Sequence, residues 1–182
     1  MRQYFALSAI GHDRPGIVAD LAELIYECDC NLEDSSMTIL GSEFAVLLLL
    51  SGEGAQVEER LAAACKRLEW EKRLTVFFRP LDGELPPRDP DAVVPMTCTV
   101  TGVDRAGIVA RVARTLERHG VNITDLKTQA RRGAESGTPI FTMRIAMDVP
   151  RAVDRRTLAR DLERVASELA VEIALAERAA DA

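Results

Sequence analysis

The chain contains the same motif twice, once near the start of each half. Residues 11–21 read GHDRPGIVADL, and residues 102–112 read GVDRAGIVARV. At an offset of 91 positions, segments 11–37 and 102–128 are identical at ten positions, and from residue 140 onward the hydrophobic pattern continues at an offset of 97. A repeat of this length predicts two homologous modules rather than one fold with a chance similarity.

Hydrophobic periodicity predicts the same order of elements in both modules. Short apolar runs such as YFALSAIG and FAVLLLL, bounded by turn residues, are typical of strands. Apolar residues recur at helical spacing in segments 17–28, 57–68, 108–116 and 158–169. The predicted order is βαββαβ, twice. With right-handed crossovers, both helices cover one face of a four-stranded antiparallel sheet. The sequence therefore predicts the α+β class, with two ferredoxin-like modules.

A proline-rich segment separates the modules. PLDGELPPRDPDAVVP, residues 80–95, holds five of the eight prolines and four acids, which favours an extended, semi-rigid linker. We therefore expect module 1 at residues 1–79, module 2 at 96–177 and a short tail at 178–182. Six extra residues enter the second module near RRGAESG, 131–137, as a lid or as a loose hairpin tip.

Composition narrows the class of protein. Hydrophobic residues make up 47% of the chain and the net charge is −6, which suits a globular protein without a broad nucleic-acid surface. No apolar run approaches the roughly 20 residues of a membrane span, and the N-terminus lacks a convincing signal-peptide cleavage site. We expect a cytoplasmic protein with no membrane contact. Its four cysteines then serve as small buried side chains, without disulfides, metal or cofactor.

The repeated motif lies where a strand passes into a helix, and it has two interpretations. As a purely structural element, Asp caps the helix and Pro15 fits its first turn. As a binding site, the motif keeps Gly16 and Gly107 where a helix start does not in general require glycine, so that another group can approach the backbone.

The chemistry of such a site suits an α-amino acid. The N–H groups of the first helical turn have no intrahelical partner and point outward, which makes them a receptor for a carboxylate. Asp13 and Asp104 are placed to accept a hydrogen bond from an ammonium group. Asn31 and Asn122, at the start of the next strand, either end the preceding helix in a left-handed conformation or reach a ligand held by a neighbouring module.

The element order, the Asp-Arg-x-Gly-Ile-Val motif and the later Asn-Leu or Asn-Ile resemble the ACT domain, a regulatory module that binds amino acids. Two such modules without an attached enzyme resemble the glycine cleavage system transcriptional repressor family. The resemblance implies a ligand between two modules. The implied binding residues are Gly11, His12, Asp13, Gly16, Ile17 and Asn31 in module 1, and Gly102, Asp104, Gly107, Ile108 and Asn122 in module 2.

The same resemblance bears on the ligand. Serine-binding members carry a polar side chain two residues before the Asp, where this chain has Gly11 and Gly102. Glycine is therefore favoured over serine. His12 is either a polar contact in this loop or an ordinary surface histidine.

The two modules differ in charge along their first helix. Residues 1–79 sum to −5 and residues 96–182 to +2. Three equivalent positions reverse sign: Asp20, Glu23 and Glu27 against Arg111, Arg114 and Arg118. These charges either changed on the solvent-exposed surface without a function, or they form complementary faces of modules that pack within the chain or between chains. We expect a homo-oligomer such as a dimer, without direct contact to nucleic acid.

The sequence shows no catalytic motif. It has two histidines, at non-equivalent positions, and no HExxH, GxSxG or P-loop pattern. We therefore expect a non-enzymatic regulator that binds a small amino acid and controls a partner. The resemblance suggests a DNA-binding transcription factor of glycine cleavage as that partner. The alternatives are a ligand-free interaction protein and a regulatory subunit of a metabolic enzyme.

Overall fold

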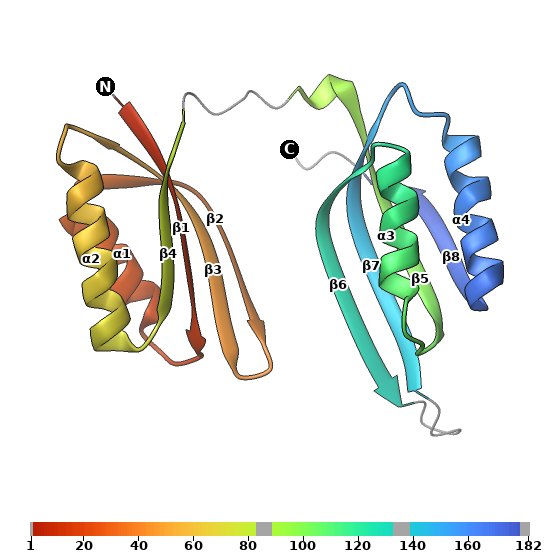
Figure 1. Ribbon diagram of the computed structural model, residues 1–182, viewed down its shortest axis with the longest axis horizontal. Coiled ribbons are helices and arrows are strands. Elements are labelled where there is room, and N and C mark those ends of the chain that lie inside the picture. Colours follow the sequence, from red (N-terminus) through yellow and green to blue (C-terminus); the bar gives the residue numbers. More distant parts are fainter. Residues whose placement is uncertain (1, 83–88, 133–138, 179–182) are drawn as a thin grey trace. The chain divides into compact units, whose positions relative to one another are not determined.

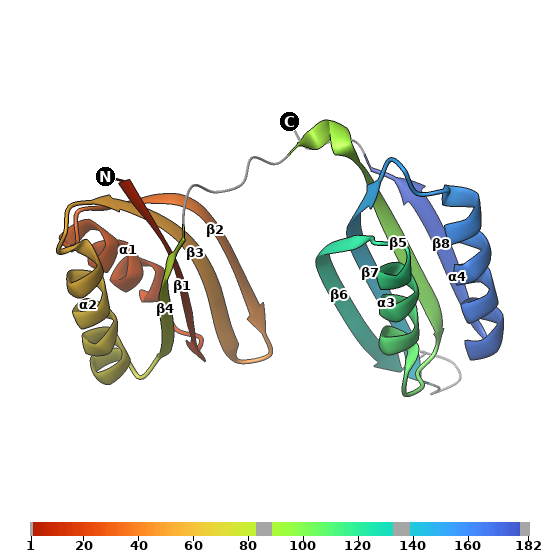
Figure 2. The same ribbon diagram turned by 45° about the horizontal axis from the view of Figure 1, so that its top comes forward.

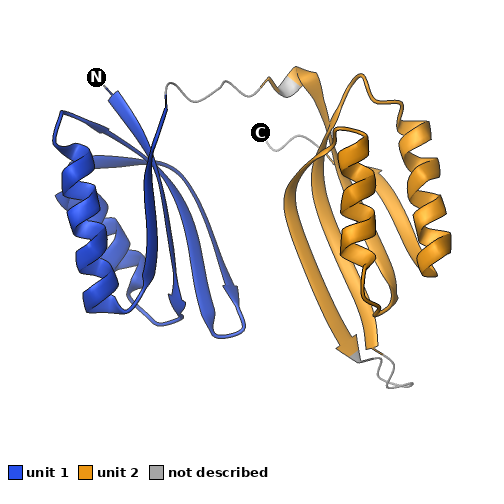
Figure 3. Cartoon of the chain, viewed as in Figure 1, with its two compact units in different colours: residues 1–87 blue, residues 88–182 orange. Residues whose placement is uncertain are grey.

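The computed structural model describes residues 2–82, 89–132 and 139–178, which form two compact units divided between Pro87 and Arg88 (Figure 3). Unit 1 contains β1 (Arg2–His12), α1 (Ile17–Glu27), β2 (Cys30–Leu40), β3 (Glu43–Glu53), α2 (Val57–Lys72) and β4 (Thr75–Leu81). Unit 2 contains a short 3₁₀ turn (Pro90–Ala92), β5 (Val93–Val103), α3 (Ile108–Arg118), β6 (Asn122–Arg132), β7 (Pro139–Pro150), α4 (Arg155–Leu169) and β8 (Val171–Glu177).

Each unit is one antiparallel sheet with two helices on a single face (Figures 1 and 2). The strand order is β2-β3-β1-β4 in unit 1 and β6-β7-β5-β8 in unit 2, so the first strand of each unit lies in the middle of its sheet. This arrangement confirms the α+β class and the duplicated βαββαβ order. The first strand therefore delivers its C-terminal loop from the centre of the sheet.

Buried and less buried residues alternate along the central strands, and the buried ones form the core. Phe5, Leu7 and Ala9 of β1 are fully buried, and residues between them are only half-buried or exposed. In unit 2 the equivalent core positions of β5 include Cys98 and Val100. Each large side chain removed from water in this way contributes roughly 1.5–3 kcal/mol to folding.

The cysteines are small components of these cores. Cys28, Cys65 and Cys98 are buried, and Cys30 is half-buried. Burial raises the pKa of Cys65 and of Cys98 to about 11, so both remain neutral thiols at physiological pH. Among the described residues, no group of three or more acidic, histidine or cysteine side chains is arranged to hold a metal ion.

The sheet faces without helices differ between the units. In unit 1 this face carries large apolar side chains, with Leu47 57% and Phe77 64% exposed. In unit 2 the corresponding face carries mainly small and polar side chains, among them Thr97, Thr99, Arg144 and Ala174. Unit 1 therefore leaves the larger apolar sheet surface in contact with water.

Both ends of the proline-rich segment 80–95 belong to strands. β4 continues through Leu81, and β5 begins at Val93. Residues 83–88, and residues 133–138 of the second-module insertion, lie outside the described residues, so the linker's stiffness and the insertion's role stay predictions. No described helix is long and apolar enough to span a membrane.

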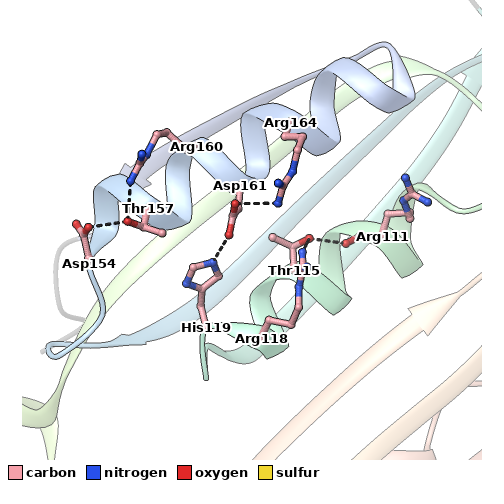
Figure 4. A network of polar contacts seen from close by, with 9 residues as sticks. All are labelled: Arg111, Thr115, Arg118, His119, Asp154, Thr157, Arg160, Asp161 and Arg164. Atoms are coloured by element: carbon pink, nitrogen blue, oxygen red, sulfur yellow. Dashed lines mark hydrogen bonds and ion pairs between the residues drawn. The ribbon is translucent and has the colours of Figure 1, made fainter.

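A hydrogen bond joins the two helices of unit 2. Nε2 of His119, the residue that ends α3, lies 2.9 Å from Oδ2 of Asp161 on α4 (Figure 4). The other carboxylate oxygen of Asp161 accepts a hydrogen bond from Arg164 at 2.9 Å. The bond from His119, followed by the charge of Arg164, holds the pKa of Asp161 below its usual value.

We predict that Asp161→Asn lowers the melting temperature at pH 7. A lowered folded-state pKa means that the charged carboxylate stabilises the fold fully above the unfolded pKa of about 4. That contribution disappears as the pH falls through the lower folded-state value. The difference in melting temperature between wild type and Asp161→Asn should therefore shrink below about pH 4. Glu163→Gln, on the same helix, is the control, and a difference independent of pH would contradict this assignment.

Candidate functional site

The loop that follows the first strand of each unit ends at a glycine with an unusual backbone conformation. Gly16 is the N-cap of α1, with φ +95°, and Gly107 is the N-cap of α3, with φ +97°. No side chain caps either helix. Asp13 and Asp104 therefore do not serve as helix caps, in contrast to Asp154, whose carboxylate accepts the Arg156 N–H at the start of α4.

The positive φ also corrects one step of the sequence argument. A helix start in general does not require glycine, but this one does, because L-residues with side chains rarely adopt φ near +95°. The backbone conformation by itself therefore explains why glycine stands at positions 16 and 107. Among the described residues, the space beside them is nevertheless open: a Cβ at Gly107 would meet none of their atoms within 4 Å, and one at Gly16 would meet only Arg14 at 4.0 Å.

The backbone of each loop is tied to the neighbouring hairpin. The Asp13 N–H donates to the Ser42 carbonyl at 2.8 Å, and the Asp104 N–H donates to the Pro139 carbonyl at 3.0 Å. The side chains of both aspartates remain exposed. The loop position is therefore fixed by main-chain bonds, which leaves the two carboxylates available to solvent or a ligand.

Ile17 and Ile108 anchor the helices to the core. Their side chains are 2% and 1% exposed. They hold the first turn of each helix against the sheet, so only their main-chain groups can face a ligand. The outer first-turn residues Val18 and Val109 are exposed, which leaves the mouth of each helix partly apolar.

The two loops differ in charge balance. In unit 1, Asp20 accepts hydrogen bonds from Lys72 at 2.9 Å and from Arg14 at 3.0 Å, and these two cations hold the pKa of Asp20 below its usual value. In unit 2 the position of Asp20 is taken by Arg111, and the structure places no carboxylate within ion-pair distance of Arg105 in its described part. Arg14 is thus neutralised locally, whereas Arg105 stays exposed.

Packing leaves no room for a side chain at Gly102 and, less strictly, restricts the space at Gly11. A Cβ at Gly11 would lie 2.6 Å from Cδ2 of Leu74, and a Cβ at Gly102 would lie 2.6 Å from Cγ1 and 3.1 Å from Cα of Val171. Both positions thus face the strand that closes the sheet. Their lack of a side chain has a steric cause, whatever the ligand.

Asn31 and Asn122 lie far from these loops within their own units. Asn31 pairs with Ser51, which also pairs with Tyr4, seven residues before Gly11 on β1. At roughly 3.3 Å per residue, the two ends are about 23 Å apart. A single unit therefore does not place its loop and its asparagine around one small ligand. His12, exposed, lies 3.7 Å from Glu43 and is also at the loop end.

Sequence reasoning did not find a β-bulge that both edge strands share. The register shifts between Leu32 and Asp34 in β2 and between Ile123 and Asp125 in β6, which are equivalent positions. In unit 1 the extra residue, Glu33, accepts hydrogen bonds from buried Ser51 at 2.5 Å and from Arg2. The only feature of the sequence that pointed to this bulge was Ser51, a serine within the otherwise apolar strand β3.

The family comparison agrees with this geometry. The ACT domain profile matches residues 3–79 and 95–176, one match to each unit. The chain belongs to the ACT domain family. Its two matched segments are the two units of the structure, so the motif loops are the same loop in two ACT modules.

Several known proteins are similar to this chain over nearly its whole length. The glycine cleavage system transcriptional repressor of Escherichia coli K12 is 26% identical over 171 residues, which cover 92% of this chain and 86% of the relative. The crystal structure of an unknown protein from Galdieria sulphuraria superposes with a TM-score of 0.78 at 27% identity, covering 98% of this chain and all of that one. A candidate glycine cleavage system transcriptional repressor superposes at 0.76 with 20% identity and 98% coverage of both chains, which supports the fold.

We predict that Gly102→Ala destabilises unit 2 by about 2 kcal/mol, because the added methyl group overpacks a contact with a β-branched side chain and its backbone. Gly11→Ala should cost less, since Leu74 can rotate away. The measurement is chemical denaturation. The same Gly102→Ala change in a Val171→Ala background, which lacks the Cγ1 atom that the new methyl group meets, is the control and should cost less. An equal cost in both backgrounds would refute the packing explanation.

We predict that Gly107→Ala lowers the free energy of unfolding by about 1–2 kcal/mol, the cost of a left-handed conformation for a residue with a Cβ. Gly107→Asn should cost less, because asparagine adopts positive φ more readily. Thermal denaturation of both variants measures the difference. If Gly107→Ala is as stable as wild type, helix α3 does not begin as described.

Proposed function

We propose that the chain is a regulatory protein that binds a small α-amino acid at the helix mouth of an ACT module. The observation that carries this proposal is the uncapped first turn of α3 behind Gly107, with open space beside the glycine. The ACT family and the named repressor relative support a regulatory role. The chain is not proposed to be an enzyme.

The ligand is recognised through its two charges. Its carboxylate lies against the free N–H groups of the first helical turn, where the helix dipole favours a negative charge. Its ammonium group is held by the carboxylate of Asp104, three residues before the N-cap. Arg105, next in sequence and exposed, adds positive charge for the carboxylate.

The second module is the better receptor of the two. In module 1 the corresponding arginine, Arg14, already binds Asp20, and Arg14 also lies nearest to the open space at Gly16. In module 2, Arg105 has no such partner among the residues that the structure describes, and a Cβ at Gly107 would meet none of their atoms within 4 Å. We therefore assign the main site to Asp104, Arg105 and Gly107, and a weaker one to Asp13 and Gly16.

The exposed asparagines complete the site from another module. Within one unit, the asparagine and the motif loop lie at opposite ends of the strands. Asn31 or Asn122 therefore reaches the bound amino acid only if a different module presents its edge strand to the loop. Ligand binding then favours one arrangement of modules, and a partner that recognises this arrangement is controlled by linkage.

Glycine is the proposed ligand. A relative that matches 92% of this chain is named for repression of glycine cleavage. A small ligand also suits a site without a designated side-chain pocket. We propose a transcription factor of glycine cleavage as the partner, because the chain's net charge of −6 opposes its own approach to phosphates. A metabolic enzyme is the alternative partner.

A second candidate is a ligand-free interaction protein. The large apolar side chains on the bare sheet face of unit 1, Phe77 and Leu47 among them, favour this role because such a surface is commonly covered by another protein. This candidate predicts no response to any amino acid.

Isothermal titration calorimetry tests the proposal. Glycine should bind wild type and raise its melting temperature, because a ligand of the folded state stabilises that state. Asp104→Asn and Arg105→Gln should each weaken binding by about tenfold or more, the loss expected for one charge-assisted hydrogen bond. The matched variants Asp13→Asn and Arg14→Gln should have smaller effects.

Two glycine analogues serve as controls for the charge recognition. Glycinamide lacks the carboxylate and acetate lacks the ammonium group, so neither should bind measurably. Absence of binding heat and of thermal stabilisation for all twenty amino acids would reject the sensor and leave the interaction protein.

A further inference from the structure

The same positions line a groove between the two helices in both units. In unit 1 the groove between α1 and α2 has a volume of about 210 Å³, and in unit 2 the groove between α3 and α4 has about 420 Å³. Seven lining positions correspond in the repeat: Asp20 and Arg111, Glu23 and Arg114, Leu24 and Thr115, Glu27 and Arg118, Arg67 and Arg164, Leu68 and Val165, Glu71 and Glu168. We call these the acidic groove and the basic groove.

Three positions on the first helix set the sign of each groove. The acidic groove is lined by four carboxylates and two cations, and the basic groove by four guanidinium groups and one carboxylate. On the second helix an arginine, an aliphatic residue and a glutamate line both grooves, whereas Ala64 and Lys72 line the acidic groove alone. The opposite charges therefore sit on surfaces of the same architecture, at matching places along the helices.

The basic groove presents its charges to solvent. Figure 4 shows Arg111 and Arg118 on α3 and Arg164 on the facing α4. The side chain of Arg114 is 72% exposed and that of Arg164 is 60% exposed. Each has a local partner, Glu117 for Arg114 and Asp161 for Arg164, but surface pairs of this kind contribute little and exchange readily.

The acidic groove retains uncompensated charge. Asp20 is neutralised by Lys72 and Arg14, and Glu27 pairs with Arg67 at 2.5 Å. Glu23 and Glu71 also line the groove, and neither forms an ion pair with another described residue. Net negative charge thus faces outward where the other unit carries net positive charge.

We propose that the basic groove of one chain docks on the acidic groove of a second copy of the chain. Each chain carries both surfaces, so a twofold dimer joins two acidic–basic pairs and leaves neither charged groove unmatched. Complementary charges set the orientation and the rate of such an association, and they weaken as salt shortens the Debye length. The sequence predicts a dimer, and this proposal places the dimer interface on the helices of each unit.

Sedimentation velocity at about 50 μM protein tests this pairing, since the Debye length falls from above 20 Å at 20 mM salt to below 5 Å at 500 mM. Wild type should dimerise at 20 mM NaCl, with a dissociation constant at least about tenfold weaker at 500 mM. Glu23→Arg/Glu27→Arg makes both grooves basic, and Arg114→Glu/Arg118→Glu makes both acidic. Each double variant should be monomeric by itself, with an unchanged circular dichroism spectrum.

An equimolar mixture of the two variants gives the decisive result. Every groove then has an oppositely charged counterpart on the other variant, so the mixture should form heterodimers as tightly as wild type to within about tenfold. The control Lys66→Glu/Arg79→Glu changes net charge equally, outside the grooves, and should dimerise. A monomeric wild type at low salt, double variants that dimerise normally, or a mixture that stays monomeric would each overturn the proposal.

Discussion

Each module depends on a glycine that starts its first helix from a left-handed conformation. Gly16 and Gly107 turn the chain from the central strand into the helix within a few residues, and no side chain caps the helix that follows. The loop backbone is held by the neighbouring hairpin and the helix by a buried isoleucine. Exposed main-chain donors at a fixed place are the result, and amino-acid binding is proposed on them.

Duplication gave the chain two copies of this loop, and local charges made them unequal. Asp20 binds Arg14 in the first module, while Arg111 at the same position leaves Arg105 exposed in the second. The same substitution of acid by arginine inverts the groove between the helices. A few charged positions on one helix face thus make the two modules differ in both proposed roles, ligand binding and self-association.

The sequence predicted the fold because its signals are local and occur twice. Alternation in β1 and β5, helical spacing after each glycine and the repeated motif together specify βαββαβ, and the structure confirms it. Backbone conformation was harder to predict: the sequence does not show which glycines adopt a positive φ, and a serine in an apolar strand was the only signal of the bulge. Gly11 and Gly102 were interpreted through the ligand, although Val171, distant in sequence, already leaves no room for a Cβ at Gly102, and Leu74 restricts the space at Gly11.

Nuclear magnetic resonance can test, at the level of single atoms, whether glycine binds at the start of α3. In a titration of isotopically labelled protein with glycine, we predict that the backbone amide signals of Ile108, Val109 and Ala110 shift first and most. The equivalent amides of Ile17, Val18 and Ala19 should shift less. Unchanged signals at both helix starts, or shifts confined to other surfaces, would contradict it.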